Sequence, residues 1–289
     1  MIDVRPAPAR LRALLAGDEV VVAPGVYDGL SARLVEQAGF AAVYASGGAI
    51  ARSMGYPDLG LLSVSEVVDR LTTIVDAVGV PVIADADTGY GNALNTRRAV
   101  QAFARAGVAG LHLEDQDFPK RCGHYDDKAL IPAHEMVQKL RAARDAAGDG
   151  LVLIARTDAI AVEGLDAAIE RSQRYADAGA DLLFIEAPTT VAQIEEIARR
   201  VPQPKLINMF EGGKTPLLPA ARLGELGYRV VIVPSDLQRA AIHAMAATLA
   251  AIRRDGDSHA VRERMVSFDE RERVIGTDAY LELDRRYGV

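Results

Sequence analysis

The sequence predicts a closed (β/α)8 barrel of the TIM type, and three observations support this fold class. Eight short, mostly apolar runs recur along the chain, and segments with helical periodicity lie between them. The five clearest helical segments each end at a glycine, as helices commonly do. No glycine-rich loop of the dinucleotide-binding type follows the first run, which argues against the alternative of an open, doubly wound sheet.

The elements can be assigned in chain order from these patterns. The expected strands are Val20–Ala23, Ala42–Ala45, Val82–Ala84, Gly110–Leu113, Leu151–Ala155, Leu182–Ile185, Lys205–Ile207 and Arg229–Val233. The expected helices are Asp28–Ala38, Ser65–Val78 with Ser65 as its cap, Asn95–Ala106, Pro132–Ala147 and Leu165–Ala178. We expect one domain over residues 1–289, with a C-terminal helical extension at about 255–289 in which Leu281–Tyr287 is helical.

Composition limits the class of partner. The 289 residues carry a net charge of −7, which argues against nucleic acid or an anionic membrane as a partner. An acidic protein that binds an anionic substrate must therefore gather positive charge locally. No apolar run reaches the roughly 18 residues of a membrane span, and residues 1–10 lack the apolar segment of a secretory signal. Cys122 is the only cysteine, which excludes an internal disulfide and suits a reducing cytoplasm.

Polar side chains lie at or just after the end of every expected strand, at the barrel end where catalytic residues gather. They are Tyr27, Asp28, Tyr44, Ser46, Asp85, Asp87, His112, Glu114, Arg156, Asp158, Glu186, Asn208, Glu211 and Ser235. Any one of these could be a solvated loop residue. Their presence at all eight strand ends favours an active site instead.

Asp85 and Asp87 form a candidate metal site. Alternation along a strand would direct both side chains into the barrel mouth. Two carboxylates so close need a cation, and Mg²⁺ prefers oxygen ligands and usually takes only one or two carboxylates from a protein. Glu114 and Asp58 could hold metal-bound waters. The alternative is a pair of acids that cap a helix.

The loop after the fourth strand gathers reactive side chains. It contains Lys120, Arg121, Cys122, Gly123 and His124. Neighbouring cations lower a thiol pKa from about 8.5, and a glycine lets such a loop fold over a ligand. The loop could thus supply both charge and a proton donor, or it could be a charged surface turn with an incidental cysteine.

A second loop, Ser46–Gly48, offers unobstructed backbone N–H groups that can hold a carboxylate. A tight turn would use the same residues. The sequence alone leaves both interpretations open.

Together these motifs resemble the lyase branch of the isocitrate lyase/phosphoenolpyruvate mutase superfamily. The matching stretches are SGG at 46–48, PDLG at 57–60, DADTGYG at 85–91, HLEDQ at 112–116, KRCGH at 120–124, ARTDA at 155–159 and NMFEGGKTP at 208–216. The KRCGH loop is specific to the lyases, because the branches that act on C–P bonds carry an asparagine- or threonine-containing loop there.

The resemblance implies an enzyme that uses Mg²⁺, with Mn²⁺ as a possible substitute, to cleave a 2-hydroxy dicarboxylate into a 2-oxo acid. It implies the metal residues Asp85, Asp87, Asp58 and Glu114, and the catalytic residues Cys122, Tyr44, Lys120 and His124. It also implies the substrate-binding residues Ser46, Gly47, Gly48, Gly123, Arg156, Glu186, Asn208 and Arg239. Cys122 would be the proton donor, and either Tyr44 or a metal-bound hydroxide would be the base. The expected assembly is a cytoplasmic homotetramer with exchanged C-terminal helices.

Within the lyases, two residues bear on the substrate. Arg239 matches a carboxylate-binding arginine of 2-methylisocitrate lyases, but a further arginine of those enzymes is replaced by Phe268. An apolar ring there should favour an alkyl group over a third carboxylate. We therefore expect a 2-alkylmalate of the 2,3-dimethylmalate type. The runner-up is 2-methylisocitrate, followed by oxaloacetate decarboxylase or hydrolase activity. A phosphorylmutase and a non-catalytic binding barrel are disfavoured.

Overall fold

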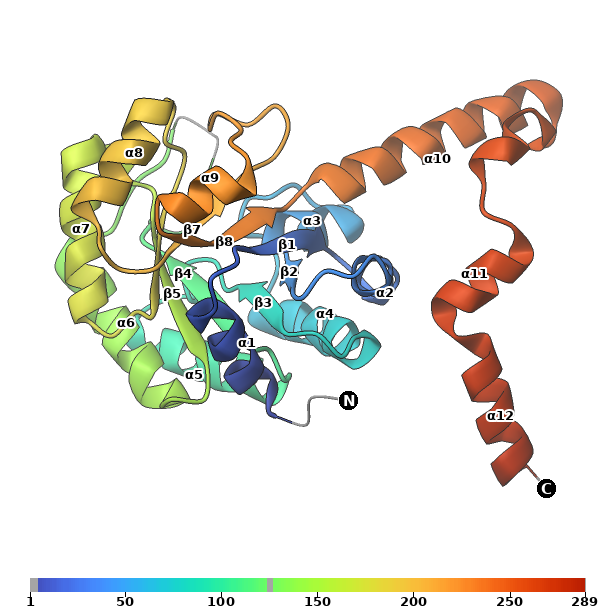
Figure 1. The fold of residues 1–289 in the computed structure, drawn as a ribbon, viewed down its shortest axis with the longest axis horizontal. Coiled ribbons are helices and arrows are strands. Elements are labelled where there is room, and N and C mark those ends of the chain that lie inside the picture. Colours follow the sequence, from blue (N-terminus) through green and yellow to red (C-terminus); the bar gives the residue numbers. More distant parts are fainter. Residues whose placement is uncertain (1–4, 124–126, 289) are drawn as a thin grey trace.

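Eight parallel strands close into one barrel in the order β1 to β8 (Figure 1). The structure is a computed structural model that describes residues 5–123 and 127–288. The strands are β1 (Val21–Val26), β2 (Val43–Ala45), β3 (Val82–Asp85), β4 (Gly110–Glu114), β5 (Val152–Thr157), β6 (Leu182–Ile185), β7 (Lys205–Asn208) and β8 (Tyr228–Val233). Val21 pairs with Val230 where β1 meets β8, which closes the sheet. The predicted fold class is confirmed, and every strand overlaps its predicted range.

Most helices surround the barrel, whereas the last three form an arm that leaves it (Figure 1). The helices are α1 (Ala7–Ala16), α2 (Gly29–Gln37), α3 (Gly47–Ser53), α4 (Val64–Ala77), α5 (Ala93–Arg105), α6 (Ala133–Ala147), α7 (Leu165–Asp177), α8 (Val191–Arg200), α9 (Ala220–Glu225), α10 (Asp236–Asp255), α11 (Phe268–Ile275) and α12 (Thr277–Tyr287), with short 3₁₀ turns η1 (Ala159–Ala161) and η2 (His259–Arg264). Gly39, Gly107 and Gly179 follow their helices at φ of 86°, 88° and 105°, as the glycine pattern predicted.

Several helix starts differ from the prediction, among them that of α5, which begins at Ala93 after the cap Asn92 rather than at Asn95. Helix α4 is capped by Ser63 rather than Ser65, because Glu66 stands three residues after Ser63 and completes a reciprocal capping box. Helix α3 begins at Gly47, in a stretch that the sequence suggested was an irregular loop. Helix α1 was not expected, and its Leu11 is fully buried in the cluster of side chains that fills the barrel interior.

The barrel interior changes from apolar to polar along its axis. Its lower layers hold aliphatic side chains such as Ile83 and Ile154, and Leu11 of α1 joins them. Towards the carboxyl ends of the strands, Tyr44 and Phe184 continue this cluster, and His112 is buried against both rings. The apolar interior therefore supports a polar layer at the top, where the candidate site residues lie.

The C-terminal part of the chain forms an arm that leaves the barrel. Helix α10 extends outward, and α11 and α12 turn back along the side of the molecule (Figure 1). Its anchor on α2 includes a 2.9 Å hydrogen bond from Gln37 Nε2 to the carbonyl oxygen of Val274. Large apolar side chains remain exposed on the arm, including Leu249 at 65%, Phe268 at 68% and Tyr287 at 70%. Among the helices of the described residues, none is both long and apolar enough to cross a bilayer.

Candidate active site

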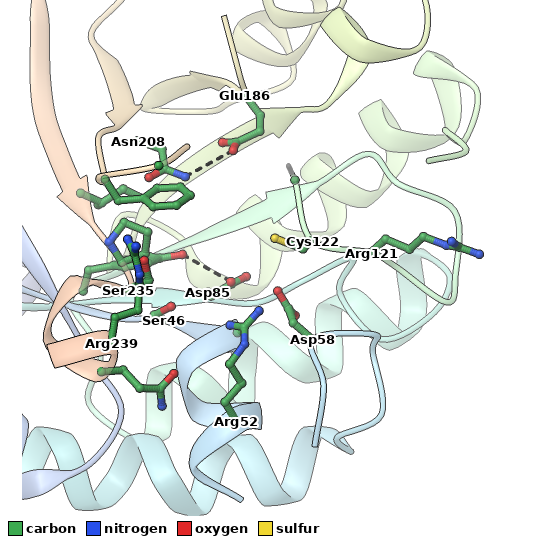
Figure 2. A pocket seen from close by; sticks show the side chains of 18 of the residues that line it. Ser46, Arg52, Asp58, Asp85, Arg121, Cys122, Glu186, Asn208, Ser235 and Arg239 are labelled. Atoms are coloured by element: carbon green, nitrogen blue, oxygen red, sulfur yellow. Dashed lines mark hydrogen bonds between the residues drawn. The ribbon is translucent and has the colours of Figure 1, made fainter. Parts of the chain in front are cut away.

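A cavity of about 440 Å³ opens at the carboxyl ends of the strands (Figure 2). Strand ends and the loops after them supply most of its lining. The lining includes Tyr44, Ser46, Gly48, Asp58, Asp85, Lys120, Cys122, Gly123, Arg156, Glu186, Asn208 and Arg239. All of these were candidate site residues in the sequence. Of the other candidates, Gly47 and Asp87 line a small adjoining cavity, Glu114 is buried, and His124 lies outside the described residues.

The two glycines after β2 allow acidic side chains to approach the backbone. Ser46 caps α3 by accepting a hydrogen bond from the Ala49 amide, and Gly47 and Gly48 form the first turn. A Cβ atom on Gly47 would lie 2.7 Å from a carboxylate oxygen of Asp85, and one on Gly48 would lie 2.7 Å from Asp58. Any larger residue would displace these acids, which gives a steric reason for the pair of glycines.

Asp85 and Asp87 are close together, although not for the reason that strand alternation suggested. Strand β3 ends at Asp85, and Asp87 lies in the following turn at φ 46°, with its amide donating to Asp85 Oδ1 at 3.0 Å. The backbone therefore turns around the first carboxylate instead of continuing as a strand. Lys120 contacts Asp58 and lies 2.7 Å from Asp87 Oδ1, so one ammonium joins two loops.

Burial and neighbouring charges separate the pKa values of these two carboxylates. Burial by itself would raise both. For Asp85, the charges of His112, Lys120 and Arg156 outweigh burial and lower the pKa to about 2. For Asp87, burial together with the charges of Asp85 and Asp58 outweighs the lowering effect of Lys120 and raises the pKa to about 6. Asp85 is therefore the persistent anion of the pair.

Tyr44 and His112 form a buried pair beside Asp85. The Tyr44 hydroxyl lies 2.8 Å from His112 Nε2 and 3.3 Å from Asp85 Oδ2. Burial, and secondarily the charge of Asp85, raises the pKa of Tyr44 well above 10, while burial lowers the pKa of His112. The phenol is therefore protonated at neutral pH, and it could act as a base only beside added positive charge.

Arg156 places a guanidinium inside the cavity. Its Nε and Nη2 bond to Asp158 at 2.8 and 3.1 Å, Glu114 lies 3.4 Å away, and the group stacks over the Phe184 ring. The pKa of Arg156 is raised well above its usual value: burial opposes this, but Asp158 and Glu114 outweigh it. A permanent cation held by a fixed carboxylate is well suited to bind a substrate carboxylate.

The loop that carries Cys122 lies directly over this guanidinium. A Cβ atom on Gly123 would be 2.3 Å from Arg156 Nη2 and 2.8 Å from Glu186 Oε1, so only glycine allows the loop to approach this closely. Glu186 also accepts a hydrogen bond from Asn208 Nδ2 at 3.3 Å. Figure 2 shows the Cys122 sulfur directed into the cavity.

The two cations expected near the thiol have other partners. Arg121 points away from the cavity and pairs with the exposed Asp127 (Figure 2). Lys120 binds Asp58 and Asp87 instead. Both cations of the loop therefore pair with neighbouring carboxylates.

Sequence reasoning did not identify several residues that line the cavity. Arg52 projects from α3, which was interpreted as a loop because it begins with two glycines. Phe210, Gln238 and Ile242 also line the cavity, and Gln238 ties α10 to α3 by donating to the Ala49 carbonyl at 2.9 Å. Arg239 of α10 was identified through the family resemblance, whereas only a helix start directly after the last strand could have indicated Gln238 and Ile242.

The donor set fits a hard divalent cation. Asp58, Asp85 and Asp87 line the small adjoining cavity, and Oε1 of the buried Glu114 has no hydrogen-bond partner among the described residues. Within residues 5–123 and 127–288, no three acidic, histidine or cysteine side chains form a complete metal cage. Mg²⁺ needs no such cage, because it commonly keeps several waters and takes one or two carboxylates.

Comparison with known proteins decides the family. The family described as phosphoenolpyruvate phosphomutase matches residues 11–253. The chain belongs to this family. It is 42% identical to 2,3-dimethylmalate lyase of Eubacterium barkeri, over 97% of this chain and 98% of that protein. It is 44% identical to 2-methylisocitrate lyase of Aeropyrum pernix, over 95% and 89% of the two chains.

Solved structures of this family agree with the fold. A crystal structure of 2,3-dimethylmalate lyase superposes with a TM-score of 0.93 at 37% identity, covering 99% of this chain and 97% of that one. A phosphonopyruvate hydrolase solved with oxalate and Mg²⁺ superposes with a TM-score of 0.89 at 32% identity, covering 98% and 99%. The likeness extends over the whole barrel and the arm.

Proposed function

We propose that this family member is a Mg²⁺-dependent carbon–carbon lyase that cleaves a 2-alkylmalate of the 2,3-dimethylmalate type into a 2-oxo acid and a carboxylic acid. The observation that carries the proposal is the shared cavity of Cys122, Asp85 and Arg156. It combines a proton donor, a metal-binding carboxylate and a cation for the substrate carboxylate. These are the three groups that such a cleavage requires.

The first stage needs the substrate to be held and polarised. Arg156 and the Ser46–Gly48 turn would bind the carboxylate next to the hydroxyl-bearing carbon. Asp85 would hold Mg²⁺, with Asp87, Asp58 and Glu114 acting through waters. When bound, the ion would act as a Lewis acid towards the hydroxyl and carboxylate oxygens. Tyr44 is the candidate to take the hydroxyl proton, which requires that the charge of the bound ion first lower its pKa enough for it to lose its own proton.

In the second stage the bond between C2 and C3 breaks, and C2 becomes the carbonyl carbon of the 2-oxo acid. The electron pair of the broken bond passes to the other fragment, a carboxylate enolate. Arg156 and Asn208 would stabilise its negative charge. Cys122 then donates its proton to the α-carbon, which completes the carboxylic acid product. Lys120 and His124, on the same loop as Cys122, are proposed to assist catalysis.

The preference for an alkyl group is supported by the cavity wall rather than by Phe268, which lies on α11 and is not among the residues that line the cavity. Phe210, Ile232 and Ile242 give one side of the cavity an apolar surface. A methyl group would be buried there at little cost, whereas an additional carboxylate would lose hydration. The 2,3-dimethylmalate lyase among the relatives points in the same direction.

The second candidate is 2-methylisocitrate, which carries a third carboxylate. One observation favours it: Arg239 lies at the cavity mouth, where its guanidinium contacts the Glu211 carbonyl and lies 3.6 Å from Asp236. The 2-methylisocitrate lyase among the relatives is also similar. Comparing the two substrates on the same preparation discriminates between these candidates.

The proposed assembly is a cytoplasmic homotetramer in which subunits exchange their C-terminal helices. Exposed apolar side chains on α10, α11 and α12 support an arm that is covered by a neighbouring subunit. Deleting residues 256–289 should then yield a smaller species in analytical ultracentrifugation. If the truncated protein has as many subunits per particle as the full-length protein, the exchange is contradicted.

The test of the reaction is a panel of 2-hydroxy acids with Mg²⁺, scored by release of 2-oxo acid. We expect 2,3-dimethylmalate to have the highest kcat/KM, followed by 2-methylisocitrate, with oxaloacetate turnover as the further alternative. Asp85→Ala should lose activity together with its response to Mg²⁺. Full activity in EDTA, or no 2-oxo acid from any member of the panel, would refute the proposed reaction.

A further inference from the structure

Lys128 is a buried lysine next to the loop that carries the thiol. Its side chain is 0% exposed, as is that of its partner Asp158, whose Oδ1 lies 2.8 Å from Lys128 Nζ. The same ammonium donates a second hydrogen bond to the carbonyl oxygen of Gly123. A buried ammonium is costly unless it is paired and hydrogen-bonded, and this one has both kinds of partner.

Asp158 connects this ammonium to the carboxylate-binding cation. Its two oxygens accept hydrogen bonds from Arg156, and its own backbone amide donates to Asp115 Oδ1 at 3.0 Å. Asp158 is therefore fixed at the end of β5 independently of the loop. The contacts run from Gly123 through Lys128 and Asp158 to Arg156.

The residue on the other side of the cysteine is also held. The Gln116 side chain accepts a hydrogen bond from the Arg121 amide and donates one to the Arg121 carbonyl, both at 2.9 Å. Cys122 thus lies between two anchored neighbours, Arg121 held by Gln116 and Gly123 held by Lys128. Of these two anchors, only Lys128 is connected, through Asp158, to Arg156, the residue that would bind the substrate carboxylate.

We propose that Lys128 is a positioning residue that sets the place of the Cys122 thiol relative to the Arg156 guanidinium. Its effect on turnover rests on the proposed lyase reaction, but its effect on the thiol does not. The ammonium makes no contact with the reacting atoms. It acts by fixing the Gly123 carbonyl against Asp158, so that the thiol and the cation share one rigid support.

Lys128→Met tests this role, because methionine keeps the unbranched shape and most of the length and removes the donors. A displacement of about 1 Å costs roughly 100-fold in rate, so kcat should fall by about that factor. KM should change less than about threefold, because Asp158 still holds Arg156 through a bidentate, charge-assisted pair. Alkylation of Cys122 by iodoacetamide, read by mass, should accelerate about tenfold as the loop opens locally.

Lys205→Met is the matched control. Lys205 is also a buried lysine, and it donates to the carbonyl oxygens of Val201 and Gln203 at the opposite end of the barrel. Its replacement should lower thermal stability without changing either kcat or the alkylation rate. If both variants lose stability but neither changes the alkylation of Cys122, Lys128 has only a structural role and the proposal is overturned.

Asp158→Asn provides a second variant of nearly unchanged shape should Lys128→Met fail to fold. It weakens the acceptor for both cations, so Cys122 should be alkylated faster and KM should rise. Wild-type alkylation in this variant would also overturn the proposal. The alkylation assay needs no substrate, so it remains decisive even if the panel of 2-hydroxy acids shows no turnover.

Discussion

The ammonium of Lys120 lies 2.7 Å from Asp87 Oδ1 and also contacts Asp58. This contact brings a lysine of the thiol-bearing loop onto the carboxylates proposed to surround the metal. The loop that carries Cys122 and the proposed metal site are therefore electrostatically linked, and a change in charge at one should affect the other.

Protonation of Asp87 should weaken Mg²⁺ binding at mildly acidic pH. Its pKa is raised to about 6, so the carboxylate gains a proton as the pH falls through that value, whereas Asp85 stays ionised. The Mg²⁺ concentration for half-maximal activity should rise by up to about tenfold per pH unit below 6, and change little above 7. Asp87→Asn should remove this step. Equal half-activation at pH 5 and pH 7 in the wild type would contradict the assignment.

Cys122→Ser should separate binding from turnover. A serine hydroxyl is a far weaker acid than a thiol, so donation of a proton to carbon should slow by at least about 100-fold. The dissociation constant of oxalate, measured by calorimetry with Mg²⁺ present, should stay within about threefold because Arg156 is untouched. Wild-type turnover in this variant would exclude the thiol as the acid.

Local patterns in the sequence predicted the barrel and most of the residues that line the cavity, and the failures have physical causes. The strands were identified because apolar runs and glycine caps are local signals, and barrel topology then places every strand end on one face. Helix α3 was missed because Gly47 and Gly48 have poor helix propensity, whereas contacts with Asp85 and Asp58 require them there. Lys128 was missed because a lysine in a charged loop normally indicates exposure, and its burial depends on Asp158, thirty residues away in sequence.

Gly123→Ala should impair catalysis with little loss of stability. The added methyl group would lie 2.3 Å from Arg156 Nη2, so the loop or the guanidinium must move. We expect kcat/KM to fall by about 100-fold or more, as for a misplacement of about 1 Å. Gly17→Ala is the control, because its Cβ would lie 3.4 Å from the nearest atom, the Leu14 carbonyl oxygen. Equal activity of the two variants would show that the close approach is not required.

Arg52 should contribute to recognition of the substrate carboxylate farther from Arg156. Its side chain extends from α3 towards the cavity (Figure 2), and among the described residues no carboxylate lies within ion-pair distance of it. Arg52→Gln should raise KM for the best dicarboxylate between about three- and tenfold, as expected for one charge-assisted contact at a partly exposed position.

Oxalate and Arg121 supply the controls for this prediction. Oxalate is too short to extend from Arg156 to the mouth, so its affinity should be the same in Arg52→Gln and the wild type. Arg121→Gln removes a guanidinium that points away from the cavity and pairs with Asp127, so KM should not change. If Arg52→Gln and Arg121→Gln raised KM equally, the effect would come from overall charge rather than from a contact at the mouth. Arg52 would then have no specific part in selecting the substrate.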